Sequence, residues 1–156
     1  MLNTTECPNL RDLGGIHTKN GVVKPMRLIR SGALWHISDT AALGQLGAVF
    51  DMRSKNERSF HPDSAFPGAD YIHIRVSESG RRKFTQSKRT FEDKVDDILA
   101  DYYRGEQSAS QRMREVYRSI VFSENTAVCI RGIIRAANAE RGAVLFHCER
   151  VKTAPA

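Results

Sequence analysis

Gly142-Ala143-Val144-Leu145-Phe146-His147-Cys148 is the stretch that decides the fold, because an apolar run of strand type ends there in a histidine and a cysteine. A thiol that follows a strand and stands at a helix N-terminus, ringed by N–H donors, loses its proton at neutral pH. The thiolate is the nucleophilic form, so Cys148 is a candidate catalytic residue. The alternative is that Cys148 is a small buried hydrophobe, the usual role of a single cysteine ending a strand.

Three further apolar runs of strand type precede this one. Together the four predicted strands comprise residues 27–30, 48–52, 71–76 and 143–146. Between the first two strands, Ser38-Asp39 predicts the N-cap of a short helix through Leu46, with Gly47 at its C-terminal end. Because a strand–helix–strand order implies parallel pairing, we expect an α/β fold with a central, mostly parallel sheet of about four strands and flanking helices.

Helical periodicity dominates the chain between the third and fourth strands. Apolar residues recur at helical spacing from Phe91 to Tyr102 and from Met113 to Val121, and a third helix is predicted from Asn125 to Ala139. The polar, basic stretch from Ser77 to Arg89 precedes these helices and is expected to be a loop. Three helices before the last strand suggest a helical insertion or lid at about residues 90–140.

Size and composition indicate one domain. A chain of 156 residues with 40% hydrophobic and 27% charged residues is typical of a single globular domain, which we place at residues 1–156. Its core is assigned to residues 9–76 and 142–148. The net charge of +6 favours an anionic partner, either nucleic acid or a phosphorylated ligand. The basic residues are scattered and form no zinc-finger, RNP-like or basic-zipper pattern, so no nucleic-acid partner is predicted.

Other classes of protein are disfavoured by simple patterns. Cys7, Cys129 and Cys148 lie far apart without paired spacing, which argues against a disulfide framework and a zinc site. We accordingly expect neither a metal nor a cofactor. No apolar run approaches the roughly 20 residues of a membrane span, and residues 1–6 show no signal-peptide pattern. These patterns predict a cytoplasmic protein, with export by a route that needs no signal peptide as the alternative.

Two polar motifs stand beside the predicted strands. The segment from Asn9 to Gly15 reads Asn-Leu-Arg-Asp-Leu-Gly-Gly, and its adjacent glycines suggest a tight turn that needs positive φ or close backbone approach. The alternative is an Asx-stabilised turn with a surface ion pair. Asp51 and Arg53 stand at the C-terminal end of the second predicted strand, where open α/β sheets bind ligands. They could equally serve to hold a loop together.

Taken together, the segments resemble the bacterial and fungal tyrosine-protein-phosphatase family whose members open with an Asn-x-Arg-Asp-Leu-Gly-Gly signature. The matching segments are Asn9 to Gly15, Leu28-Ile29-Arg30-Ser31-Gly32-Ala33-Leu34, Asp51-Met52-Arg53-Ser54-x-x-Glu57 with Pro62-Asp63, and Leu145-Phe146-His147-Cys148. Each segment alone is weak, but their order and approximate spacing match from Asn9 to Cys148. The resemblance implies a protein-tyrosine-phosphatase-like fold.

The resemblance also implies a reaction and its residues. Cys148 as thiolate would attack phosphorus, and water would then hydrolyse the phosphocysteine. The residues expected to support the loop or attract phosphate are His147, Arg11, Asp12, Asp51 and Arg53. The substrate would be a phosphorylated protein, above all phosphotyrosine, or a phosphoinositide. The general acid stays open among Asp12, Asp51, Asp93, Asp96, Asp97 and Asp101.

The resemblance fails after Cys148. The family's loop reads His-Cys-x-Ala-Gly-Lys-Asp-Arg-Thr-Gly, whereas this chain continues Glu149-Arg150-Val151-Lys152-Thr153-Ala154-Pro155-Ala156. Synonymous codons for these residues, with one base restored in the first codon, translate as x-Ala-Gly-Lys-Asp-Arg-Thr-Gly. We therefore predict a frameshifted, truncated copy of a phosphatase gene, or a sequencing error, with the C-terminal part of the domain missing. The product is expected to be inactive, because the loop glycine and the correctly spaced arginine are absent.

Two alternatives come from other functional classes. A non-catalytic remnant would bind a phosphoprotein or a phosphoinositide without hydrolysing it. A rhodanese-like sulfurtransferase also presents a cysteine after a strand, although the segment from Asn9 to Gly15 argues against it.

Overall fold

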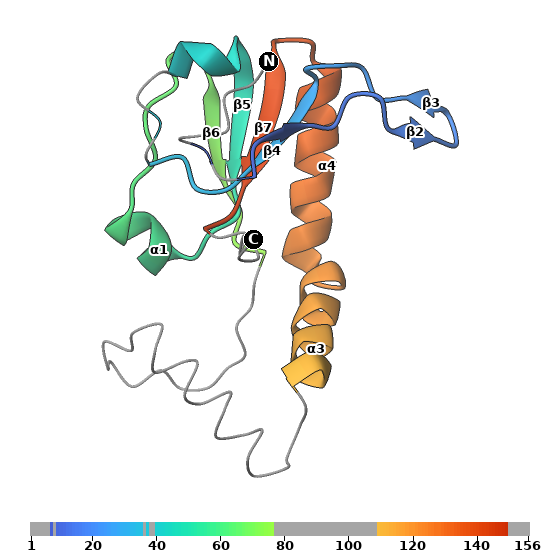
Figure 1. Ribbon diagram of the computed structural model, residues 1–156, viewed down its shortest axis with the longest axis vertical. Helices are drawn as coiled ribbons and strands as arrows, with labels where there is room; N and C mark the ends of the chain where they lie inside the picture. Colours follow the sequence, from blue (N-terminus) through green and yellow to red (C-terminus); the bar gives the residue numbers. More distant parts are fainter. Residues whose placement is uncertain (1–6, 8, 36, 38–39, 77–108, 150–156) are drawn as a thin grey trace, which may run out of the picture. The chain divides into compact units, whose positions relative to one another are not determined.

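The computed structural model describes residues 7, 9–35, 37, 40–76 and 109–149 (Figure 1). The chain divides into two compact units, one made of residues 1–76 and 124–156 and the other of residues 77–123. The first unit contains the sheet and helix α4 (Glu124–Asn138), and the second contains helix α3 (Ala109–Val121). The single-domain organisation and the boundaries of a helical insertion stay predictions.

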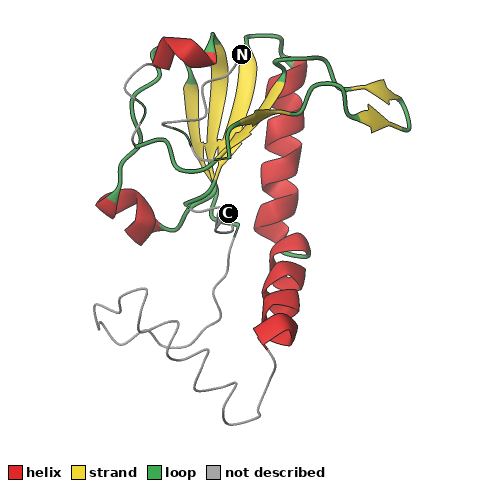
Figure 2. Ribbon diagram, viewed as in Figure 1, coloured by secondary structure: helices red, strands yellow, loops and turns green. Residues whose placement is uncertain are grey.

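The main sheet has five strands in the order β1-β4-β7-β5-β6 (Figures 1 and 2). Their bounds are Arg11–Asp12 for β1, Leu28–Ser31 for β4, Leu46–Asp51 for β5, Asp70–His73 for β6 and Ala143–His147 for β7. All neighbours pair in parallel except β1, which runs antiparallel to β4. The structure thus confirms the α/β class, the mostly parallel sheet and all four predicted strands.

Three short features were not predicted. The strand β1 adds a fifth member to the sheet, and β2 (His17–Thr18) and β3 (Gly21–Val22) form a separate antiparallel ribbon. Helix α1 (Lys55–Phe60) begins with a capping box, in which Ser54 accepts from the Glu57 N–H and Glu57 accepts from the Ser54 N–H. All of these elements are too short to leave a periodic pattern in the sequence.

The other helices follow the predictions with one correction. The helices predicted at Met113 to Val121 and at Asn125 to Ala139 are confirmed as α3 and α4. The helix predicted to run through Leu46 is instead a 3₁₀ turn, η1 (Thr40–Leu43). Gly47 does not end it but lies inside β5, because Gly44, with φ of +68°, takes the left-handed position after the turn.

Two parts of the sequence predictions lie outside the described residues. They are the helix from Phe91 to Tyr102 and the loop from Ser77 to Arg89.

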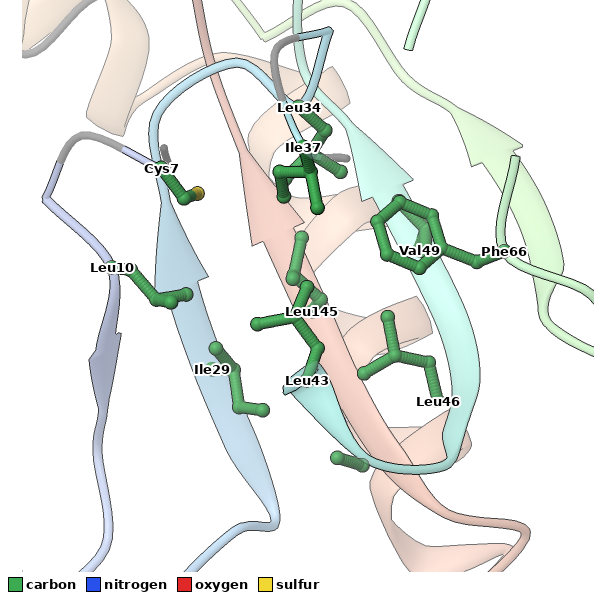
Figure 3. Packing of buried hydrophobic residues seen from close by; sticks show 11 residues of the cluster. Cys7, Leu10, Ile29, Leu34, Ile37, Leu43, Leu46, Val49, Phe66 and Leu145 are labelled. Atoms are coloured by element: carbon green, nitrogen blue, oxygen red, sulfur yellow. The ribbon is translucent and has the colours of Figure 1, made fainter. Parts of the chain in front are cut away.

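The central strands β5 and β7 have side chains buried on both faces of the sheet. One cluster, shown in Figure 3, packs Ile29, Val49 and Leu145 against the N-terminal segment and the loops that follow β4 and β5. A second cluster packs Phe50 and Val144 against α4 on the opposite face. Side chains alternate between the faces along each strand, as β geometry requires. Burial on both faces explains why the runs that form β5 and β7 consist almost entirely of apolar residues.

Candidate active site

The carboxyl ends of the parallel strands carry polar side chains at matched positions. His147, the last residue of β7, lies opposite Ser31 of β4 on one side and opposite Asp51 of β5 on the other. By alternation all three lie on the face of Ile29, Val49 and Leu145, and all three are buried. The edge at which open α/β sheets bind ligands therefore begins with a buried polar cluster.

Arg53 is the centre of this cluster. Its Nε and Nη2 donate to the two carboxylate oxygens of Asp51, each at 3.0 Å, and its backbone N–H donates to Asp51 Oδ1 at 2.9 Å. Nη2 also lies 2.7 Å from Asp63 Oδ2. Nη1 donates to the His61 carbonyl at 2.7 Å. The guanidinium thus joins the end of β5 to the loop after α1, and its side chain is only 1% exposed.

The charge states of Asp51 and Arg53 follow from this arrangement. Burial disfavours the charged form of Asp51, but the hydrogen bonds from Arg53 and the charge of His147 outweigh it and lower the pKa of Asp51. Burial likewise disfavours the charged guanidinium, yet the hydrogen bond with Asp51 and the charge of Asp63 raise the pKa of Arg53. The pair is therefore ionised and stable only as a unit.

The His147 ring packs against two carboxylates of the same cluster. Its Nε2 lies 3.1 Å from Asp63 Oδ2 and 3.9 Å from Asp51 Oδ1. Neither ring nitrogen has a hydrogen-bond partner with suitable angles among the described residues. Asp63 is held from the other side, because its Oδ1 accepts from the Leu34 N–H at 3.2 Å. The imidazole directly before the nucleophile candidate is therefore packed against a fixed carboxylate.

Asp51, Asp63 and His147 also have the donor types of a metal site, and their ligand atoms lie within 4.8 Å of one another. The space between the two carboxylates already contains a cation, because Arg53 Nη2 contacts both of them. The cation that joins the two carboxylates is thus Arg53, and Arg58 Nε lies 3.0 Å from Asp51 Oδ2 as a second one. The sequence prediction of no metal and no cofactor stays a prediction.

Cys148 follows β7 directly and is partly exposed. The Nη2 of Arg30 lies 4.0 Å from its Sγ, and the same guanidinium lies over the ring of Phe146 at 6.0 Å from the centroid. A neighbouring cation favours the thiolate form of a cysteine. Arg30 is a site residue that the sequence analysis did not single out, although it ends a predicted strand.

Glu149 turns back toward the Arg53 cluster. Its Oε2 accepts from Arg53 Nη1 at 3.2 Å, and its Oε1 lies 3.1 Å from His61 Nδ1. The residue immediately after the candidate nucleophile is therefore anchored by the loop that follows α1. Nothing in the sequence pattern connects His61 and Asp63 with Glu149, since only tertiary structure brings these segments together.

Of the remaining predicted residues, Arg11 and Asp12, the second stabilises a turn at the start of the chain. Asp12 Oδ1 accepts from the Gly14 N–H at 2.9 Å, and Oδ2 accepts from the Met26 N–H at 2.7 Å. This is the Asx-type turn that the sequence analysis left open. The structure therefore brings Asp51, Arg53, His147 and Cys148 to the carboxyl edge of the sheet, whereas the Asp12 carboxylate stabilises a turn.

The paired glycines of this turn behave as the sequence predicts. Gly15 has a φ of +84°, and a Cβ on Gly14 would lie 2.5 Å from the Pro25 Cα. Arg11 lies opposite Arg30 in the β1–β4 register, but its side chain is exposed and has no ion pair among the described residues. Its role at the site stays a prediction.

These features define a class of protein, an α/β protein with a cysteine presented at the carboxyl edge of a parallel sheet. The model of a family described as the tyrosine phosphatase family matches residues 2–152, and the chain belongs to this family. No curated protein matches the chain. Among the described helices, none is long and apolar enough to cross a membrane. The cytoplasmic location stays a prediction.

Proposed function

We propose that this chain has the architecture of a cysteine-dependent phosphomonoesterase. Cys148 is the nucleophile, and phosphotyrosine protein is the main substrate class. The observation that carries the proposal is the position of Cys148, directly after the central strand β7 and beside Arg30, whose Nη2 lies 4.0 Å from Sγ. Family membership supports the same reaction. A phosphoinositide would present the same phosphomonoester to the thiolate.

The reaction would proceed in two steps. Attack of the Cys148 thiolate on phosphorus breaks the P–O bond of the ester and forms a phosphocysteine, and the leaving phenolate oxygen of the tyrosine takes up a proton. Water then hydrolyses the phosphocysteine and releases inorganic phosphate. The Arg53 cluster would hold the end of β7 and His147 in place beneath the thiol. Its side chain is too buried and too fully paired to bind the phosphate itself.

We further propose that the sequence as it stands turns over phosphate esters at a negligible rate. The family loop implied by the resemblance places an arginine six residues after the cysteine, where this chain has Ala154. Glu149 takes the first position after the cysteine, and its carboxylate is bound by Arg53 and His61. Because the loss of one donor to a developing oxyanion costs about 10²–10³ in rate, the loss of the arginine and the glycine together leaves little activity.

The test compares two chains, each with a Cys148→Ser control. The first is the sequence as it stands, and the second has residues 149–156 replaced by Glu-Ala-Gly-Lys-Asp-Arg-Thr-Gly. Release of 4-nitrophenol from its phosphate ester is expected only from the second chain, and only with Cys148 present. Cysteine-dependent turnover by the first chain would refute the proposed inactivity. A folded second chain with no vanadate-sensitive, cysteine-dependent turnover would refute the role of Cys148.

The reading-frame hypothesis has its own test. Resequencing the gene across the Cys148 codon is expected to reveal one additional base, after which the frame reads Ala-Gly-Lys-Asp-Arg-Thr-Gly. Confirmation of the frame shown would instead favour the second candidate, a protein that binds phosphorylated ligands without hydrolysing them.

A further inference from the structure

Arg11 and Arg30 stand opposite each other on neighbouring strands of the sheet. They are Cα partners in the antiparallel register of β1 and β4. Directly opposed side chains in such a pair leave the same face of the sheet, with Cβ atoms about 4.5–5.5 Å apart. Two guanidinium groups therefore share one small area of the surface, and like charges in this position destabilise the strand pair.

The arginine pair lies on the face of the sheet that carries Cys148. In the register Arg30 is the partner of Phe146 on β7, and Phe146 is the partner of Phe50, which packs against α4. Cys148 comes two residues after Phe146 and shares its face, and Arg30 Nη2 lies 4.0 Å from the Cys148 Sγ. Helix α4 packs mainly against β5 and β7, so Arg11, on the outermost strand, stays exposed.

Neither guanidinium group is neutralised by a carboxylate. No described residue forms an ion pair with Arg11 or with Arg30. Asp12, the acidic residue next to Arg11 in the chain, accepts from two backbone N–H groups, and the carboxylates at the carboxyl edge are bound by Arg53 on the opposite face. The buried Nε of Arg30 also has no hydrogen-bond partner among the described residues. A buried donor without an acceptor and two charges without a counter-charge both point to an anionic ligand.

The chemistry of the two side chains determines which anion fits. A guanidinium group is a planar fork that donates to two oxygens of one anion at a time. Two such groups supply two positive charges and donors for more than two oxygens. A carboxylate has one charge and two oxygens, whereas a phosphate or sulfate dianion has two charges and a tetrahedron of oxygens. The pair is therefore suited to a tetrahedral dianion.

We propose that Arg11 and Arg30 form a binding site for a free tetrahedral dianion, such as inorganic phosphate or sulfate, on the α4-facing side of the sheet. The site goes beyond the proposed hydrolysis, because it is built from β1 and β4 and needs no residue after Cys148. A bound dianion takes up the charge and the donors of Arg30, which otherwise favour the thiolate of Cys148. Binding of the dianion therefore lowers the reactivity of the thiol.

Alkylation of Cys148 in the presence of sulfate tests the site without any hydrolysis. The thiolate attacks the CH₂ carbon of iodoacetamide, the C–I bond breaks and iodide leaves. Sulfate is the probe because it stays a dianion at neutral pH and is not a product of phosphatase action. Sodium chloride keeps the ionic strength constant. Peptide mass spectrometry separates Cys148 from Cys7 and Cys129, which are each only 1% exposed.

The unmodified chain is expected to be alkylated several-fold more slowly at saturating sulfate. Arg11→Gln is expected to raise the half-maximal sulfate concentration about tenfold, the size expected for the loss of one charge-assisted hydrogen bond. Arg30→Met is expected to abolish the response to sulfate. The matched control is Arg141→Gln, which removes the same charge from an exposed arginine that pairs with Asp70. This control is expected to respond to sulfate as the unmodified chain does.

An alkylation rate that does not depend on sulfate would overturn the inference, as would an unchanged half-maximal concentration in folded Arg11→Gln. If Arg11→Gln does not fold, Arg11→Lys keeps the charge without the planar fork and is expected to weaken sulfate binding in the same direction. The result is independent of the phosphatase assay. Failure of the chain with the family loop to hydrolyse its ester would refute the proposed function and leave the anion site standing, whereas turnover by that chain without a sulfate response at Cys148 would do the opposite.

Discussion

Arg53 and Arg30 both place a guanidinium group at the carboxyl edge of the sheet, but the two groups differ in how many of their nitrogens are hydrogen-bonded. Arg53 uses all of its side-chain nitrogens on Asp51, Asp63, Glu149 and the His61 carbonyl. Arg30 faces the α4 side, over Phe146, with a long contact to Cys148 and a buried Nε that has no hydrogen-bond partner among the described residues. The difference indicates that Arg53 supports the fold, whereas Arg30 has donor capacity left for chemistry at the thiol.

The largest effect is expected for Arg53→Met. The substitution removes the buried cation that joins the carboxylates of Asp51 and Asp63, which costs about 3–5 kcal/mol of unfolding free energy. Urea denaturation followed by circular dichroism measures this loss. Arg58→Ala is the control, since Arg58 also contacts Asp51, at 3.0 Å, but is 42% exposed and contributes at most about 1 kcal/mol. Equal losses in the two variants would contradict the central role of Arg53.

The pH dependence of the unfolding free energy tests whether Asp51 stabilises the fold through its charge. Because the folded state lowers the pKa of Asp51, its contribution is fully present above the unfolded value of about 3.9 and is lost as pH falls through the folded pKa. Asp51→Asn is therefore expected to destabilise the protein by about 1–3 kcal/mol at neutral pH. The gap between the two proteins is expected to shrink below about pH 4.

Urea midpoints at several pH values check this expectation. Asp70→Asn serves as the control, because Asp70 pairs with Arg141 on the exposed surface. A gap that stayed constant down to the lowest pH would show that Asp51 acts through packing and not through its charge.

Arg30→Met tests whether the Arg30 guanidinium acts on the Cys148 thiol. A cation beside the sulfur favours the thiolate, so its removal is expected to slow alkylation of Cys148 by iodoacetamide several-fold at neutral pH. The unfolding free energy is expected to change far less than in Arg53→Met. Arg27→Met is the matched control, since Arg27 lies just before β4, at the end away from Cys148. Unaltered alkylation would assign Arg30 to packing against Phe146.

The smallest effect concerns the start of α1. Ser54→Ala removes one half of the capping box, and the expected loss is about 1 kcal/mol of unfolding free energy. Ser59→Ala is a suitable comparison, because Ser59 is exposed and its hydroxyl donates to a carbonyl within the helix. A loss as large as that of Arg53→Met would mean that α1, and not the guanidinium, holds the loop after β5.

The parts of the structure that were predictable are those with long, uniform patterns. Buried parallel strands read as apolar runs, and α4 shows helical periodicity over four turns, so both were visible in the sequence. The Gly14-Gly15 pair was predictable because only glycine tolerates such a turn. Helix α1 was missed although Ser54-x-x-Glu57 is a capping signature, because six residues are too few to show a hydrophobic face.

The site was predictable at its strand ends and not beyond them. Asp51, His147 and Cys148 follow apolar runs, and the rule for open α/β sheets places such residues together. Asp63 and His61 belong to irregular segments, and their position depends on hydrogen bonds from Leu34 and Arg53 that no local pattern reveals. The same limit explains Asp12, whose partner Met26 is fourteen residues away in the chain.

The central place of β7 matters for the nascent polypeptide. During synthesis the ribosome delivers β4, β5 and β6 first, but β4 and β5 cannot pair with each other because β7 lies between them. Until β7 emerges, the apolar side chains of β4 and β5 lack the strand that joins them and are exposed to chaperones and to other chains. The strand that leads to Cys148 is thus also the strand that completes the sheet. The carboxyl edge that surrounds the thiol therefore forms only when all strands of the sheet have been synthesised.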